Sequence, residues 1–194
     1  MKITVNDETL EELPGLNIGL LYCQEINNLE TNNDLDFLIK NMKKSLKNNF
    51  TKQELIRKIE HEKILNKPLL EKFVEEIYKK DSTLKNNISN ICMYLSFQKF
   101  VPIFSIDVKN ITNDIEIKIS TQSSLDIKSG AEKININDYR VNKSTKNLIM
   151  LFASYNKKET KQILIELNQL VKRVCGGKNT GYLLNRNNKN KKIN

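Results

Sequence analysis

The stretch from Phe97 to Ile119 reads Phe-Gln-Lys-Phe-Val-Pro-Ile-Phe-Ser-Ile-Asp-Val-Lys-Asn-Ile-Thr-Asn-Asp-Ile-Glu-Ile-Lys-Ile. Pro102 lacks an N–H and clashes with the preceding turn, so a helix that enters this stretch should end before it. From Ile115 onward, isoleucines alternate with polar residues, the pattern of a strand with one exposed face. The stretch therefore predicts a passage from helix to sheet, and we expect any ligand pocket at that junction.

Upstream of this stretch, the sequence predicts strands at residues 3–5 and 18–26, with a short helix at 7–13 between them. Four helices follow in succession, because apolar residues recur three and four positions apart, the spacing of one helix face. Thr51 and Glu54 form a capping-box pattern at the start of the second of these helices.

Downstream, the sequence predicts mainly strands, at residues 115–120, 133–137, 147–153 and 182–184. A long amphipathic helix at 157–175 is stopped by Gly176-Gly177, since glycine readily adopts the left-handed backbone that ends helices. This order of elements predicts an α+β fold in a single domain over residues 1–185. Residues 186–194 are expected to be a basic, disordered tail.

The charge of the chain favours an anionic partner. Its 194 residues carry a net charge of +9, and the tail contributes four cations and no acid, at Arg186, Lys189, Lys191 and Lys192. Such a charge suits binding to a polyanion such as RNA. An equal interpretation is that the charge only reflects biased codon usage toward Lys, Asn and Ile, with a solvated tail. No apolar run reaches the roughly 20 residues of a membrane span, and acidic residues in the first ten argue against a signal peptide. We therefore expect a cytoplasmic protein without membrane contact.

Cysteine and histidine offer little chemistry. Cys23, Cys92 and Cys175 lie far apart among apolar neighbours, so we expect buried thiols and no disulfide framework. The only histidine, His61, has charged neighbours and no second ligand three or four residues away, so we expect it on the surface. The sequence predicts neither a metal site nor a cofactor, and no catalytic residue is assigned.

Several short motifs follow one another along the chain, each occurring once. They are Leu13-Pro14-Gly15, Ile18-Gly19, Pro102 with Asp107, Val141, Thr145-Lys146-Asn147 and Cys175-Gly176-Gly177. In this order they resemble the B3/B4 domain of the phenylalanyl-tRNA synthetase beta chain, particularly the free-standing proteins built from that domain alone. The resemblance covers about residues 1–185.

The resemblance implies a three-layer fold, with packed helices and a β-sandwich of unusual topology. In the synthetase this domain is an editing domain, which hydrolyses the ester of tyrosine wrongly attached to the phenylalanine tRNA. Such a site needs selective contacts to the amino acid and a positioned water beside a polarised ester carbonyl. The implied partner is tRNA or aminoacyl-tRNA, with or without a synthetase, and DNA is not expected.

Four residues at matching places are candidates for the pocket: Phe104, Asp107, Asn142 and Thr145. Phe104 stands where the synthetase editing segment has a His, and polar residues at 121–124 replace its Gly-Glu pair. By resemblance, Asp107 would orient the amino acid, and Asn142 and Thr145 would contact the ester or ribose. Simpler interpretations are that Phe104 fills the core and that Asp107 caps the turn after it.

Basic residues surround the last two of these candidates. Arg140, Lys143 and Lys146 suit contacts to RNA phosphates, but a solvated loop is an equal interpretation. Two functions therefore stay open. One is a tRNA-linked module that binds mischarged aminoacyl-tRNA in trans and hydrolyses it; the other is a non-catalytic RNA- or amino-acid-binding protein on the same scaffold. Aminoacylation itself is not expected, because no motif for binding ATP is present.

Overall fold

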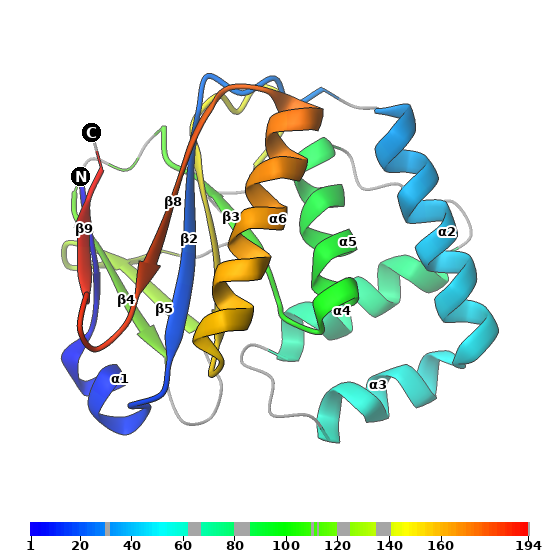
Figure 1. Cartoon of the computed structure of the whole chain (residues 1–194), viewed down its shortest axis with the longest axis horizontal. Helices are drawn as coiled ribbons and strands as arrows, with labels where there is room; N and C mark the ends of the chain where they lie inside the picture. Colours follow the sequence, from blue (N-terminus) through cyan, green and yellow to red (C-terminus); the bar gives the residue numbers. More distant parts are fainter. Residues whose placement is uncertain are drawn as a thin grey trace.

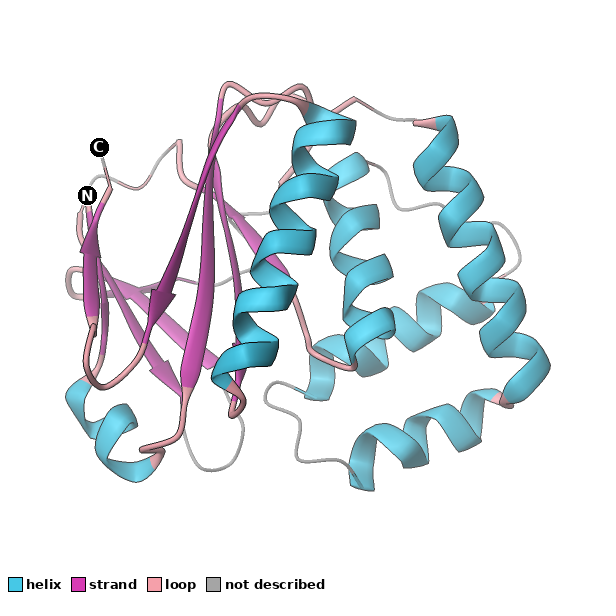
Figure 2. Cartoon of the chain, viewed as in Figure 1, coloured by secondary structure: helices cyan, strands magenta, loops and turns pink. Residues whose placement is uncertain are grey.

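A computed structural model describes residues 1–29, 32–61, 67–79, 86–109, 111, 113–119, 125–134 and 141–193. In these ranges there are two β-sheets and six helices, arranged as an outer sheet, a central sheet and a layer that holds all the helices except the first (Figure 1; Figure 2). The predicted α+β class is confirmed.

In chain order, the described elements are β1 (Lys2–Val5), α1 (Asp7–Glu12), β2 (Asn17–Gln24), α2 (Asn33–Asn49), α3 (Lys52–His61), α4 (Lys67–Tyr78), α5 (Asn87–Lys99), β3 (Phe104–Asp107), β4 (Ile115–Ile119), β5 (Leu125–Ser129), β6 (Glu132–Ile134), β7 (Leu148–Ser154), α6 (Lys157–Cys175), β8 (Lys178–Leu184) and β9 (Asn190–Lys192). The sequence patterns do not predict β3, β5 or β9. The strand predicted at 133–137 overlaps β6, and residues 135–137 of it lie outside the described residues.

The central sheet separates two hydrophobic cores. Its strand order is β3-β7-β2-β8, with every neighbouring pair antiparallel. Along β2, Ile18 and Leu20 point into the core shared with the outer sheet, while Leu21 and Cys23 point into the core shared with the helices. Residues of β7 alternate in the same way. Burial on both faces explains why these strands are nearly continuous apolar runs in the sequence.

The outer sheet has the order β6-β5-β4-β1-β9, and β1 pairs with β4 in parallel. The isoleucines of β4 all face the core between the sheets, as their alternation predicts. The expectation of a disordered tail was wrong, because β9 pairs antiparallel with β1 and the Ile193 side chain is buried. The prediction of disorder rested on composition, which is dominated by the exposed lysines of this segment. The backbone of the segment forms hydrogen bonds with the edge strand β1, and the side chain of Ile193 is buried.

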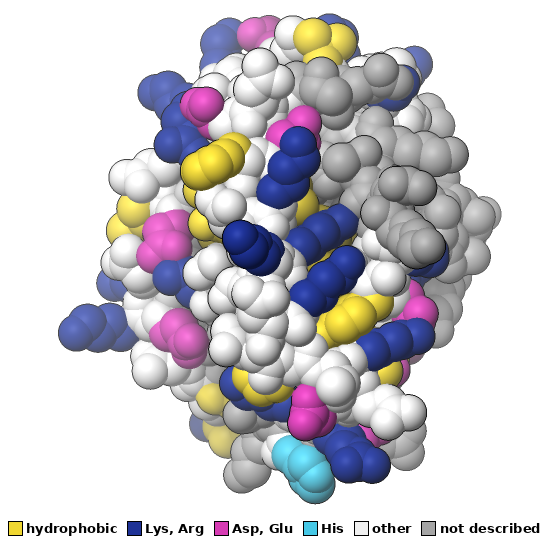
Figure 3. All heavy atoms as spheres, turned by 90° about the vertical axis from the view of Figure 1, so that its right-hand side faces the viewer, with side chains coloured by type: hydrophobic (Ala, Val, Ile, Leu, Met, Phe, Trp, Pro, Cys, Tyr) yellow, Lys and Arg dark blue, Asp and Glu magenta, His cyan; other side chains and the backbone are white. Residues whose placement is uncertain are grey.

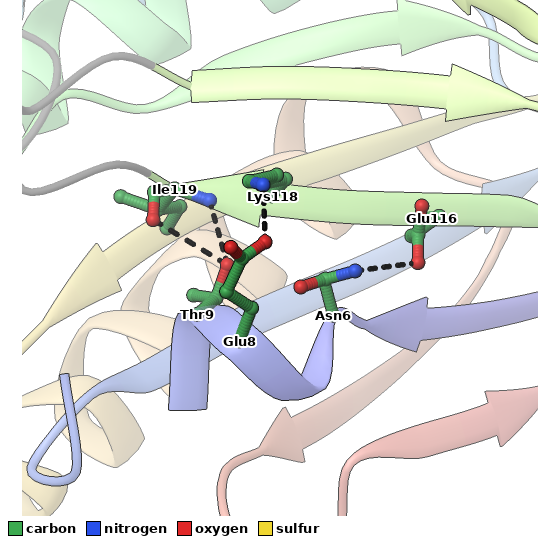
Figure 4. A network of polar contacts seen from close by, with 6 residues as sticks. All are labelled: Asn6, Glu8, Thr9, Glu116, Lys118 and Ile119. Atoms are coloured by element: carbon green, nitrogen blue, oxygen red, sulfur yellow. Dashed lines mark hydrogen bonds and ion pairs between the residues drawn. The ribbon is translucent and has the colours of Figure 1, made fainter. Parts of the chain in front are cut away.

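Helix α1 is fastened to β4 by polar contacts (Figure 4). The Thr9 hydroxyl accepts a hydrogen bond from the Ile119 backbone N–H at 3.1 Å, and the amide of Asn6 donates to Glu116 at 2.9 Å. Lys118 donates to Glu8 and forms an ion pair with it, and these two effects hold the pKa of Glu8 below its ordinary value. The first helix thus covers one end of the outer sheet.

Two of the predicted helix boundaries are confirmed by their capping contacts. Thr51 and Glu54 form the reciprocal capping box, with the Thr51 backbone N–H donating to the Glu54 carboxylate at 2.7 Å. Helix α6 has the bounds predicted for it, and Gly176, which follows its last residue, has a φ of 67°. Helix α5 ends at Lys99. Phe100 follows it, two residues before Pro102, in the left-handed conformation that a bulky side chain rarely adopts.

The three cysteines are free thiols in the core beside the helices, as predicted. Burial raises the pKa of Cys92 and of Cys175 to about 12, and it also raises the pKa of Cys23, on which the other two thiols act in the same direction. A buried thiol with so high a pKa has almost no reactive thiolate at neutral pH.

We expect all three thiols to resist a disulfide reagent such as Ellman's at about pH 8 while the protein is folded. The measurement is release of the coloured thiolate, with the protein in concentrated guanidinium as control, where all three should react. Reaction of one thiol in the folded protein at the rate of free cysteine would contradict the burial described.

Replacing Gly19 by Ala should destabilise the fold by about 1–3 kcal/mol, because overpacking strains a close-packed core. Gly19 lies opposite Phe152 in the β2–β7 register, and a Cβ there would lie 2.1 Å from the phenyl ring. Urea unfolding measures the change. Gly15→Ala is the control, since its Cβ would meet nothing closer than 3.9 Å. Equal stabilities for the two variants would contradict this packing.

Candidate functional site

The structure brings three of the four predicted pocket residues together where β3 ends and the loop at 141–147 begins. The Thr145 hydroxyl donates to the Asp107 carboxylate at 2.5 Å, and it accepts from the Asn142 backbone N–H at 3.0 Å. Thr145 is buried, Asp107 is half-buried and Asn142 is exposed. The cluster therefore runs from solvent to the edge of the core.

Asp107 also has the turn-capping role that its sequence context suggests. One of its carboxylate oxygens accepts from the Lys109 backbone N–H at 2.9 Å, while the other is bonded to Thr145. The side-chain oxygen of Asn142 likewise accepts from the Ser144 backbone N–H at 2.8 Å. Each of these acceptors thus has a partner within the protein, which fixes the loop before any ligand arrives.

Two buried asparagines that sequence reasoning missed hold the same loop from the helical side. The Asn28 side chain donates to the Asn142 carbonyl at 2.8 Å and accepts from the Ile88 backbone N–H at 3.0 Å. Asn86 donates to the Val141 carbonyl at 3.1 Å and caps the start of α5. Buried amides need such partners, and these two connect the loop to the N-terminus of α5.

The end of β2 holds the loop from a third side. The Glu25 backbone N–H donates to the side chain of Asn147 at 3.1 Å, and the Ile26 backbone N–H donates to the Lys146 carbonyl at 3.0 Å. The loop at 141–147 is therefore held by the ends of β2 and β3 and by the start of α5. We call this loop, with Asp107, Asn28 and Asn86, the polar junction.

Phe104 lies apart from the polar junction. Its ring is buried in the core between the two sheets, with Ile106 on the same side of β3. This placement favours the interpretation that Phe104 fills the core over its candidacy as a pocket residue.

The outer surface of the polar junction carries amide, hydroxyl and ammonium groups. Asn142, Lys143, Ser144 and Lys146 are all exposed there. The third predicted phosphate contact, Arg140, lies outside the described residues, as do the polar residues at 121–124. The exposed groups are suited to binding a phosphate or carboxylate, and the chemistry they offer is hydrogen bonding and charge neutralisation.

Metal ligands do not gather in the described part of the chain, where no group of three His, Cys, Asp or Glu residues could hold a metal ion. His61 is exposed at the end of α3, as its sequence context predicts. Every helix in the described ranges is too short or too polar to serve as a membrane span.

A concave region lies away from the polar junction, beside the chain end that was expected to be disordered. This hollow of about 370 Å³ is lined by Asp7, Leu10, Glu11 and residues 186–190. Within it, the Lys189 ammonium contacts both carboxylate oxygens of Asp7, at 2.8 and 2.9 Å. Because groups of both signs line the hollow, it favours neither anions nor cations.

Comparison of the chain with models of known protein families gave no match, and comparison with curated proteins gave none either. The resemblance to the B3/B4 domain therefore stays a hypothesis that rests on the quoted motifs.

Thr145→Val should destabilise the protein by about 1–3 kcal/mol, because it removes the partner of two polar groups at the edge of the core. The carboxylate of Asp107 would lose a donor, and the backbone N–H of Asn142 would lose an acceptor. Thr145→Ser is the matched control, since it keeps the hydroxyl. Urea unfolding compares the two, and a valine variant as stable as the serine variant would show that these bonds do not hold the loop.

Proposed function

We propose that this protein is a B3/B4-like module that binds aminoacyl-tRNA in trans through the polar junction. The observation that carries the proposal is the contact among Asp107, Asn142 and Thr145, which the motif resemblance selected from the end of β3 and from the loop that precedes β7. Loop segments that carry function on a rigid scaffold commonly show this kind of fixation.

The roles follow from which groups are exposed. Lys143 and Lys146 would contact phosphates, while Asn142 and Ser144 would contact the ribose or the aminoacyl ester. Asp107 and Thr145 would act as positioning residues, because their hydrogen bonds hold the loop in place. A synthetase that supplies the charged tRNA is a further candidate partner.

A specific observation favours the non-catalytic alternative. The acceptors of Asp107, Asn142 and Thr145 already have partners, and the only histidine lies on α3. Ester hydrolysis needs a group that positions or activates a water. We therefore place binding first, and hydrolysis of a mischarged tRNA is the additional activity that the following assay decides.

The test combines binding and deacylation with the full chain. We expect salt-dependent binding of tRNA, and Lys143→Gln with Lys146→Gln should lower the slope of log affinity against log salt by about one unit per lysine. A panel of correctly and wrongly charged tRNAs then measures amino acid release above the spontaneous rate. Selective release from one mischarged tRNA would establish an editing hydrolase.

Binding without release would establish the non-catalytic alternative on the same surface. An unchanged salt slope in the variant with Lys143→Gln and Lys146→Gln would contradict a role of the polar junction in binding tRNA. Absence of tRNA binding at low salt would contradict both tRNA-linked functions and leave only the binding of a free amino acid.

A further inference from the structure

A row of lysines occupies one side of α2. Lysines at 40, 43, 44 and 47 are spaced so that they share one side of the helix. The opposite side is apolar and buried in the core, at Leu35, Ile39 and Met42. From the first lysine to the last, the row extends about 10 Å along the helix axis, at roughly 1.5 Å per residue.

These cations are close enough to influence one another. The pKa of Lys43 is lowered, first by its partial burial and then by the charge of Lys47, while Glu76 acts in the opposite direction. On α4, Glu75 pairs with Lys52 at 2.7 Å and Glu76 with Lys79 at 2.6 Å, so Glu76 is shared between Lys79 and the field of Lys43. Like charges at this spacing destabilise a helix, and an anionic partner would relieve that repulsion.

Aromatic rings continue the row beyond the end of α2. Lys47 lies 5.7 Å from the ring centre of Tyr78, and the Tyr78 hydroxyl donates to the carbonyl of Phe50. Lys58 of α3 lies over the rings of Phe50 and Phe100, at 5.1 and 4.4 Å. The cations therefore continue from α2 onto α3 over partly buried aromatic rings. Proteins that bind single-stranded nucleic acid combine cations with aromatic side chains.

Figure 3 shows this side of the molecule, which is the right-hand side of Figure 1, where α2 lies. Lys and Arg side chains gather at the centre of the face, with apolar side chains between them, and most acidic side chains lie around this group. We call the strip formed by the four α2 lysines and Lys58 the α2 basic surface. The acidic residue closest to it on α2 is Asp36, one turn before Lys40.

We propose that the α2 basic surface binds the phosphate backbone of RNA. A nucleic acid strand in a duplex carries a phosphate about every 3.4 Å along the axis, so a 10 Å row of lysines faces about three of them. A lipid surface fits less well, because an amphipathic helix binds membranes through its apolar face, and that face of α2 is buried. The proposal depends on the proposed function only for the identification of the RNA as tRNA.

The test uses the full chain with Lys40, Lys44 and Lys47 changed to Gln. The matched control changes Lys157, Lys158 and Lys161 of α6 to Gln, which removes the same charge from another exposed helix. Fluorescence anisotropy with labelled tRNA and with a labelled single-stranded RNA measures affinity between about 50 and 200 mM salt. Thermal unfolding verifies that both variants fold.

The α2 variant should bind both RNAs about tenfold or more weakly, with a salt slope reduced by about two to three units, because each phosphate contact contributes about 0.7–0.9. The α6 variant should change affinity less than about twofold. Equal losses in both variants would overturn the proposal, since net charge alone would then explain the binding. Unchanged binding in the α2 variant would also overturn it.

Two further comparisons separate alternative partners and sites. Vesicles of anionic phospholipid bound as tightly as RNA, and released by the same α2 substitutions, would overturn the assignment to RNA. If the α2 variant loses RNA affinity while substitutions at Lys143 and Lys146 change nothing, the α2 basic surface stands and the proposed role of the polar junction fails.

Discussion

Burial of β2 and β7 on both faces is the constraint on which the rest of the structure depends. Each of these strands presents alternate side chains to two separate cores, so the helices and the outer sheet must both be in place for either strand to leave water. The contact between Gly19 and the ring of Phe152 shows how closely the two strands are packed. The three layers therefore form one cooperative unit.

The polar junction exists because the chain must pass between those layers. The ends of β2 and β3 and the start of α5 leave backbone groups near the core, and buried polar groups without partners are costly. Asn28, Asn86 and Thr145 supply the missing partners and fix the loop at 141–147. The exposed groups of this loop are thereby held in a single conformation, and such preorganisation lowers the entropy cost of binding.

Local patterns in the sequence predicted much of the fold. The bounds of α6 follow from its apolar spacing and its glycine stop, and the capping box at Thr51 was readable directly. The pairing of strands far apart in the chain could not be predicted from local patterns. A charged segment such as β9 has the composition of a disordered tail, and only its pairing with β1 shows that it is a strand. For the site, Asp107 and Thr145 were predicted through their motifs. Asn28 was missed because its partners lie 60 and 114 residues away in the chain.

We propose that an RNA bound to this protein contacts both the polar junction and the α2 basic surface. Lysine acetylation of the complex with aminoacyl-tRNA, followed by mass spectrometry, tests this most directly. Lys40, Lys44, Lys47, Lys143 and Lys146 should be shielded by the tRNA, while lysines at 157, 158 and 161 should react as in the free protein. Shielding confined to other lysines, or no shielding at all, would contradict the account.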